Sequence, residues 1–332
     1  MNREGLVKNS LSTTTARLLT FCYNPRESKE NKSEMTVQGA SRSVLITGAS
    51  TGIGAACAIG CAQQGMTVFA GVRDFAAGEA LRARGGTRIV PIHLDVTDTK
   101  SIQEAAQVVE ERVGPGGLWG LVNNAGIAIA SPLEVLPLAE LRRQFEVNVI
   151  GQIAVTQALL PLIRQARGRV VNMGSIAGRG TIPMMGPYSA SKFALEALTD
   201  ALRLELYPWG IEVSIIEPGA IATPIWNKSL STARTLETVI PPEGKRLYGE
   251  TAQRLREKVD ESARRSIPPD AVVQAVLHAL TAGRPRTRYL VGADAKLRAL
   301  MVTWLPDRLQ DWILKKVLKL PRAIGNLDFK SH

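Results

Sequence analysis

The sequence has few of the side chains that bind metals or cross-link small domains. Among its 332 residues are three cysteines and three histidines, and no pair of these has the spacing of a zinc finger or a CxxC motif. We therefore expect neither a metal site nor a disulfide framework, and a reduced, intracellular setting. An uncharged apolar run of the ~18 residues that a membrane-spanning helix needs is also absent. The expected location is the cytoplasm.

Positive charge is concentrated at the C-terminal end of the chain. The formal net charge is +11, and residues 281–332 carry +7 of it, with 11 Lys and Arg against 4 Asp and Glu. The remainder is close to balanced, which argues against a nucleic-acid-binding protein. Hydrophobic residues make up 45% of the chain, which is enough for a sizeable buried core.

The chain divides into three parts by composition. Residues 1–40 are polar and show no sustained periodicity, so we expect a flexible N-terminal extension; a transit peptide and a natural start at Met35 are the alternatives. Residues 41–292 alternate short apolar runs with helical segments, and residues 293–332 form a basic, amphipathic C-terminal extension. The predicted strands are Ser43–Thr47, Thr67–Val72, Arg88–Leu94, Leu118–Val122, Val170–Met173, Glu212–Ile216 and Arg288–Val291.

Strands that alternate with helices of ten or more residues are typical of βαβ units. For residues 41–292 they predict an α/β fold with a single doubly wound, Rossmann-type parallel sheet of about seven strands and helices on both faces. The first predicted strand leads into a glycine-rich turn of the form TGxxxGxG. Glycines permit a tight turn and let backbone N–H groups approach a pyrophosphate at the positive end of a helix. The turn therefore predicts dinucleotide binding by Gly48, Ser50, Thr51, Gly52, Ile53 and Gly54.

Further motifs follow the glycine turn along the chain. In order, they are NNAG at Asn123–Gly126, Asn148 within VNV, Ser175 after a predicted strand, YxxxK at Tyr188 and Lys192, and Pro218-Gly219 after another strand. Over about residues 43–225, the set resembles the fingerprint of the short-chain dehydrogenase/reductase family. Later segments look most like its hydroxysteroid and retinol dehydrogenase-like branch. The resemblance implies a nicotinamide dinucleotide cofactor with additional contacts from Asp95, Val96, Asn124, Ala125, Gly126, Tyr188, Lys192, Pro218, Gly219 and Thr223.

The end of the second predicted strand bears on the choice of cofactor. An acidic residue there binds the ribose 2′-hydroxyl of NAD, whereas a basic residue accommodates the 2′-phosphate of NADP. By resemblance to the family, Val72 stands where NAD-preferring members carry Asp, and Arg73 stands where many NADP-preferring members carry a base. We therefore favour NADP and keep NAD as the alternative, since a shift of one residue would place Asp74 at the site.

Tyr188 and Lys192 are four residues apart in a segment of helical composition, so they share one face. Hydride transfer to a carbonyl needs a proton for the developing alkoxide, and a nearby cation lowers the pKa of a tyrosine. We expect Tyr188 to be the general acid/base, with its pKa lowered by Lys192, and Ser175 to donate to the substrate oxygen. By resemblance, Lys192 also holds the nicotinamide ribose, and a backbone group of Asn148 holds a water linked to Lys192. Taken singly, a packing tyrosine, a solvated lysine and a capping serine are the plain alternatives.

The substrate side of the predicted sheet carries weaker signals. Ligands bind beyond the carboxyl ends of the strands, and the loop of about residues 220–268 lies there. Apolar residues before Tyr188 and at the start of this loop predict a lipophilic alcohol or ketone, bound by Ser175, Met184, Met185, Ile225 and Trp226. Many members of the family assemble through the helices that carry Asn148 and Tyr188, so the resemblance implies a homo-oligomer.

Residues 296–320 predict one amphipathic helix. Its apolar stripe comprises Leu309, Trp312, Ile313, Val317 and Leu320, and its lysines lie largely away from the stripe. Three interpretations stay open: a helix packed on its own domain, an interfacial helix on an anionic membrane, and a lid or dimer element.

The combined motifs predict an NADP(H)-preferring oxidoreductase that interconverts a lipophilic alcohol and its ketone or aldehyde. The alternative is a catalytically silent, dinucleotide-binding regulatory protein of the same fold. The intact set of Asn148, Ser175, Tyr188 and Lys192 argues against it, because a sensor needs no groups for proton transfer. A hydrolase is disfavoured, since Ser175 lies in GSIAG and not in GxSxG.

Overall fold

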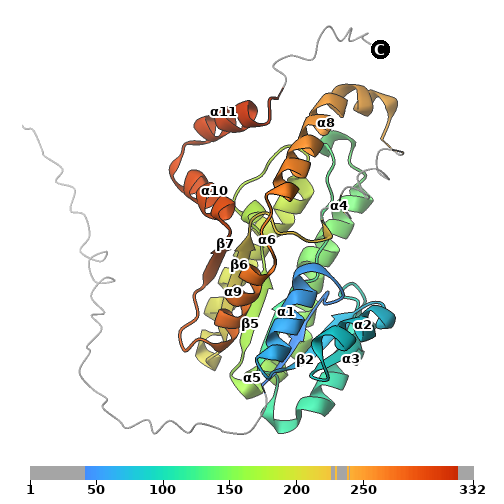
Figure 1. The fold of residues 1–332 in the computed structure, drawn as a ribbon, viewed down its shortest axis with the longest axis vertical. Helices are drawn as coiled ribbons and strands as arrows, with labels where there is room; N and C mark the ends of the chain where they lie inside the picture. The colour runs from blue at the N-terminus through green and yellow to red at the C-terminus, as the bar shows by residue number, and fades with distance from the viewer. Residues whose placement is uncertain (1–41, 226–228, 230–237, 239, 321–332) are drawn as a thin grey trace, which may run out of the picture. The chain divides into compact units, whose positions relative to one another are not determined.

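Seven strands form one parallel sheet in the order β3-β2-β1-β4-β5-β6-β7 (Figure 1). The structure is a computed structural model that describes residues 42–225, 229, 238 and 240–320. The strands are β1 Ser43–Ile46, β2 Thr67–Val72, β3 Ile89–His93, β4 Gly120–Asn123, β5 Arg169–Met173, β6 Glu212–Pro218 and β7 Arg288–Val291. The predicted doubly wound sheet is confirmed, and β2 and β7 have the predicted bounds.

The sheet changes its direction of growth between β1 and β4. The chain proceeds outward from β1 to β3 and then returns to β4 on the other side of β1. Beyond the turns that follow β1 and β4, the chain consequently continues to helices on opposite faces of the sheet, and ligands of such folds bind in the crevice at the carboxyl edge there. One of these turns is the glycine turn and the other is the NNAG motif.

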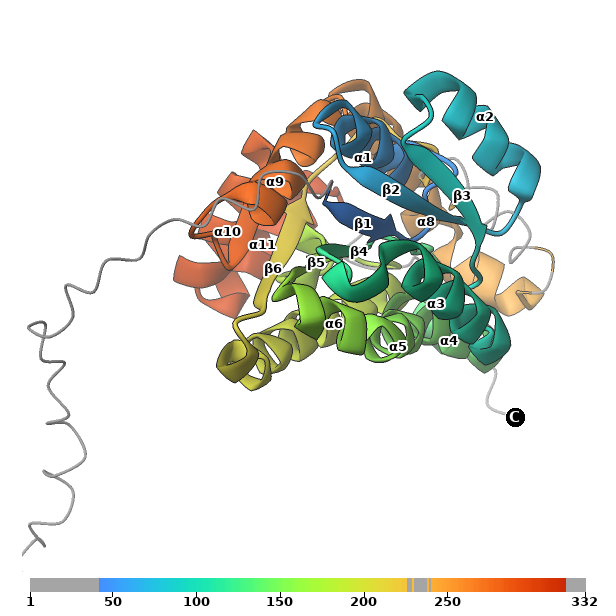
Figure 2. The same cartoon turned by 90° about the horizontal axis from the view of Figure 1, so that it is seen from below.

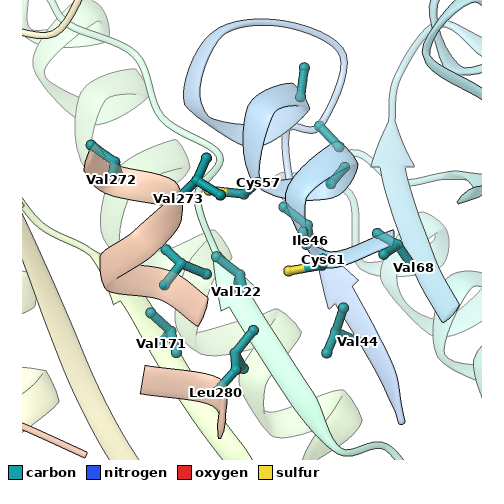
Figure 3. Packing of buried hydrophobic residues seen from close by; sticks show 14 of the residues in the cluster. Val44, Ile46, Cys57, Cys61, Val68, Val122, Val171, Val272, Val273 and Leu280 are labelled. Carbon is teal, nitrogen blue, oxygen red and sulfur yellow. The ribbon is translucent and has the colours of Figure 1, made fainter. Parts of the chain in front are cut away.

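Helices cover both faces of the sheet (Figure 2). One face carries α1 (Gly52–Gln63), α2 (Phe75–Gly85) and α9 (Asp270–Thr281), and the other carries α3 (Thr99–Val113), α5 (Gly151–Ala166) and α6 (Gly186–Glu205). Cys57 and Cys61 are residues of α1 and belong to the apolar core that α1 and α9 form with valines and isoleucines of the strands (Figure 3). Burial raises the pKa of both thiols, that of Cys61 to about 12, so they serve as packing groups and not as nucleophiles.

A continuous helix over Leu138–Ala166 spans much of one sheet face. It comprises α4 (Leu138–Phe145), a π-helical turn (Glu146–Ile150) and α5. By length and composition, it is the one helix in the described part of the chain that could cross a membrane. Half of its most apolar window is buried within the protein, which is typical of a core helix.

Three helices from the last part of the described chain lie toward the top of Figure 1. They are α8 (Pro242–Arg264) in the predicted substrate loop, α10 (Ala293–Trp304) directly after β7, and α11 (Asp307–Val317). The single helix expected over 296–320 is wrong. Pro306 separates α10 from α11, because proline confines the preceding residue to extended backbone and lacks an N–H group.

The apolar side chains of α11 lie largely at the surface. Leu309, Trp312 and Val317 are 42%, 57% and 54% exposed, and no residue within this helix is buried. Leu320 lies beyond the helix, and Leu318 is the side chain in this stretch that is buried. On the neighbouring α10, Leu297, Leu300 and Trp304 are also more than half exposed.

Candidate active site

The glycine turn after β1 packs closely against the turn after β4. Gly48 has a φ of +63°, and a Cβ there would lie 2.9 Å from the Cα of Ala125. A Cβ on Gly54 would overlap the carbonyl oxygen of Gly48. Asn124 ties the turns together, because its Nδ2 donates to the carbonyls of Thr47 at 2.9 Å and Gly48 at 3.2 Å. The turn therefore presents bare backbone at the amino end of α1.

A cleft of about 350 Å³ opens along the carboxyl ends of β1 to β6. Gly54 faces Gly48 and Asn124 and is the one predicted cofactor residue that does not line this cleft. Bare glycine backbone at a helix amino end, followed by a row of strand ends, fits a dinucleotide. The predicted cofactor residues that line the cleft are Gly48, Ser50, Thr51, Gly52, Ile53, Arg73, Asp95, Val96, Asn124, Ala125, Gly126, Tyr188, Lys192, Pro218, Gly219 and Thr223.

Two consecutive residues after β2 have different roles. Arg73 lines the cleft, whereas Asp74 caps α2 by accepting a hydrogen bond from the backbone N–H of Ala76 at 3.0 Å. Asp95, after β3, lines the same cleft and accepts hydrogen bonds from the backbone and hydroxyl of Thr97 at 2.9 Å and 2.7 Å. Burial by itself raises the pKa of Asp95, but these hydrogen bonds and the charge of Arg73 bring it below its usual value.

Ser175, Tyr188 and Lys192 come together on the wall of the cleft from two elements. Ser175 follows β5, and its Oγ accepts a hydrogen bond from the N–H of Ala177 at 3.2 Å. Tyr188 and Lys192 lie one turn apart on the buried face of α6. The Nζ of Lys192 donates to the carbonyl of Met173 at 2.7 Å and lies 5.8 Å from the ring centroid of Tyr188.

Burial governs the protonation of this cluster. Tyr188 and Lys192 are 9% and 4% exposed. Burial raises the pKa of Tyr188, and the hydrogen bond with Ser175 partly opposes that rise. Burial lowers the pKa of Lys192 to about 8, and the charge of Glu196 opposes that fall. The expected lowering of the Tyr188 pKa by Lys192 is therefore wrong for this arrangement, because desolvation of the phenol outweighs other influences.

Three buried amide side chains of the long helix hold the loop after β4. Asn148 pairs with both backbone groups of Ile127, accepting from its N–H at 2.9 Å and donating to its carbonyl at 3.0 Å. Gln144 also donates to the carbonyl of Ile127, at 2.8 Å, and Gln152 donates to the carbonyl of Ala125 at 3.1 Å. Asn148 thus supports the cleft wall from behind and does not line the cleft. Gln144 and Gln152 were not predicted, and their signal was the four-residue spacing that puts Gln144, Asn148 and Gln152 on one face of a helix.

Two further cavities share Met185 in their lining, and one of them reaches the cluster. One, of about 230 Å³, is lined by Ser175, Met185 and Tyr188, and the other, of about 330 Å³, is lined by Met184 and Met185. Ile225 lines the dinucleotide cleft and belongs to a small apolar cluster with Met185 and Tyr188. Trp226 lies outside the described residues. Leu255 of α8, within the predicted substrate loop of about residues 220–268, lines both cavities and was not among the predicted substrate residues.

Comparison with known proteins agrees with this geometry. Residues 42–234 match the family model described as short chain dehydrogenase. Retinol dehydrogenase 5 of Mus musculus is 42% identical over 284 residues, which cover 84% of this chain and 89% of that protein. The NADPH-dependent 3-dehydrocapnine reductase of Ornithobacterium rhinotracheale is 37% identical, with 84% of this chain and 98% of that protein covered. A solved short chain dehydrogenase from Burkholderia cenocepacia J2315 in complex with NADP has a TM-score of 0.63 and 27% identity, covering 85% of this chain and 98% of that one.

Fold and site together define a dinucleotide-dependent oxidoreductase. The chain belongs to the short-chain dehydrogenase/reductase family, in its retinol dehydrogenase-like branch. It is an NAD(P)-dependent enzyme that interconverts alcohols and carbonyl compounds, and its cofactor is a nicotinamide dinucleotide.

Proposed function

We propose that this enzyme prefers NADP(H), acts on a lipophilic alcohol or its ketone or aldehyde, and uses Tyr188 as its general acid/base. One observation carries the proposal: Ser175 and Tyr188 line both the dinucleotide cleft and the adjoining cavity of about 230 Å³. A substrate carbonyl group at this junction would face the hydroxyl groups of Ser175 and Tyr188 and, across them, a cofactor bound in the cleft. This is the arrangement that hydride transfer coupled to proton transfer requires.

The residues at the junction divide the work of proton transfer. A bound nicotinamide supplies or accepts the hydride. As a carbonyl is reduced, the hydroxyl of Tyr188 gives its proton to the developing alkoxide, and the hydroxyl of Ser175 donates to the same oxygen. Because burial raises the pKa of Tyr188, the phenol stays protonated at neutral pH, which suits an acid in the direction of reduction.

Lys192 and Asn148 support the reaction without taking part in the proton transfer to the substrate. Lys192 lines the cleft, which supports its role in binding the ribose hydroxyls of the nicotinamide half of the cofactor. Asn148 holds Ile127, whose loop forms part of the cleft wall. A water held by a backbone group of Asn148 and linked to Lys192 stays a prediction.

The preference for NADP rests on Arg73. Arg73 lines the cleft at the end of β2, while the carboxylate of Asp74 is used as the cap of α2. The 3-dehydrocapnine reductase that resembles this chain is named as NADPH-dependent, and the similar Burkholderia cenocepacia dehydrogenase binds NADP. Both relatives support the assignment, and NAD is the alternative that a direct measurement compares.

The lipophilic substrate class is supported by Met184, Met185 and Leu255 around the cavities, and by the retinol dehydrogenase among the relatives. We place the enzyme in the cytoplasm with a peripheral membrane contact through the exposed apolar side chains of α10 and α11. Co-sedimentation with anionic liposomes should fall when residues 305–332 are deleted, and unchanged partitioning would contradict the contact. A homo-oligomer stays a prediction.

A panel of lipophilic alcohols and ketones with NADPH and NADH, followed by the absorbance of the reduced nicotinamide, tests the proposal. We expect turnover with NADPH, and Tyr188→Phe should lower kcat by about 10²–10⁴-fold while NADPH still binds. Retained turnover in this variant would contradict the mechanism. Tight NADPH binding without turnover of any substrate by the native chain would favour the silent regulatory protein.

A further inference from the structure

The cavity of about 230 Å³ that reaches Ser175 and Tyr188 is walled by segments far apart in the sequence. Leu255 and Lys258 come from α8, Arg298 comes from α10, and Leu318 follows α11. Most of the lining is apolar or small, so each charged group in it has a large effect on what can bind. Three charged side chains of the described residues line this cavity: Lys258, Asp294 and Arg298.

Lys258 and Asp294 both have hydrogen-bonding partners within the protein. The Nζ of Lys258 lies 2.7 Å from a carboxylate oxygen of Glu261. The Oδ2 of Asp294 accepts a hydrogen bond from the backbone N–H of Ala220 at 2.7 Å, and Asp294 lies in the first turn of α10, where the helix dipole stabilises an anion.

The third charge is that of Arg298. Its Nη2 donates to the carbonyl of Thr181 at 2.7 Å, and within residues 42–320 as described no carboxylate lies in salt-bridge distance of it. Burial lowers its pKa, so the charged form is held at a cost. A guanidinium group has five N–H donors in a planar fork that matches an oxyanion, and this one uses a single backbone carbonyl in the described residues.

We propose that Arg298 binds an oxyanion, such as a carboxylate or sulfonate, at one end of a lipophilic substrate whose alcohol or carbonyl lies at Tyr188. The inference rests on the proposed function and narrows its substrate class from neutral lipophilic alcohols to amphipathic acids. Apolar lining accommodates the chain of such a molecule, and the guanidinium group of Arg298, which has no salt bridge within the described residues, supplies the specificity for its charged end.

Kinetics with a long-chain keto acid and its methyl ester test the proposal, since one methyl group removes the charge and leaves the rest of the molecule the same. We expect the native enzyme to have a higher kcat/KM for the acid, and Arg298→Gln to lower the acid-to-ester ratio by about 10–100-fold, mainly through KM. Arg298→Lys should retain part of the preference. The matched control Arg308→Gln, at an exposed position of α11, should leave the ratio as it is.

A binding measurement separates this proposal from the proposed function. A fluorescent long-chain carboxylate and the corresponding alcohol are titrated into the native protein and into Arg298→Gln, without any need for turnover. Tighter binding of the carboxylate, lost in the variant, supports the proposal even if neither keto compound is reduced. Equal affinity for the two probes in the native protein, or equal loss of both in a variant that keeps its native thermal midpoint, overturns it.

Discussion

The dinucleotide cleft and the substrate cavity share Ser175 and Tyr188, yet they are built in different ways. Turns that directly follow strands β1 to β6 wall the cleft, and each carries a short motif of its own. The cavity is walled by residues of α8 and α10, by residues between positions 175 and 189, by Gly219 and Ala220, and by Leu318. A site at strand ends can be predicted from local spacing, whereas a site between packed helices depends on which helices meet.

The largest effect should come from Arg73→Asp, which tests whether the cleft by itself sets the choice of cofactor. Loss of a charge-assisted contact and the new repulsion should raise the Kd of NADPH by about 100-fold, with little change for NADH. Titration of nicotinamide fluorescence measures both constants. Arg84→Asp, an equal change of charge at an exposed position of α2, is the control. An equal loss for both cofactors would remove Arg73 from the 2′-phosphate site.

Gly48→Ala tests the close approach of the two turns. Gly48 and Gly65 both have positive φ, but a Cβ on Gly48 would meet Ala125 and one on Gly65 would meet nothing within 4 Å. Gly65→Ala therefore isolates the cost of backbone strain. We expect Gly48→Ala to lower the free energy of unfolding by about 1–3 kcal/mol more than the control, and to weaken NADPH binding. Equal losses in urea unfolding would show that the contact with Ala125 is unimportant.

Leu255→Ala tests whether the cavity can change without the cleft. Leu255 is 8% exposed and lines both apolar cavities, so its truncation should raise the KM of a lipophilic substrate by about 5-fold, or ~1 kcal/mol. The Kd of NADPH should stay constant. Leu297→Ala, at a position of α10 that is 61% exposed, should change neither constant. A parallel change in NADPH affinity would mean that the two regions are not separable.

The smallest effect concerns Glu196, one turn beyond Lys192 on α6. Burial raises its pKa to about 7, Glu217 adds to the rise, and Arg288 opposes it. The pKa of Glu196 is higher in the folded protein than in the unfolded chain. Between pH ~4.5 and ~7, Glu196 therefore carries a proton in the folded protein that it lacks in the unfolded chain. The stability that this proton contributes is present at low pH and is lost as the pH rises through this window.

Glu196→Gln should remove that dependence. Its thermal midpoint should change less than that of the native chain between pH 5 and pH 7, by about 1–3 °C. Glu205→Gln, at an exposed position of the same helix, should keep the native slope. Parallel slopes for the native chain and Glu196→Gln would show that Glu196 is ionised throughout this range.

Prediction from the sequence succeeded where local chemistry decides the outcome. Thr67–Val72 and Arg288–Val291 were bounded correctly, because short apolar runs flanked by turn residues leave little choice. The glycine turn was placed correctly, but Gly54 proved to serve packing and not the lining of the cleft. Gln144 and Gln152 were missed, because a buried amide has no local mark that shows which loop it will hold.

The order of strands and helices, and the residues at the strand ends, were determined by the sequence alone, since periodicity and turn chemistry act over a few residues. Tertiary structure decided how charged and polar groups behave. It raised the pKa of Tyr188, lowered that of Lys192 and left Arg298 without a carboxylate partner in the described residues. The physical reason is that desolvation and pairing depend on what packs around a side chain, and those neighbours come from distant parts of the chain.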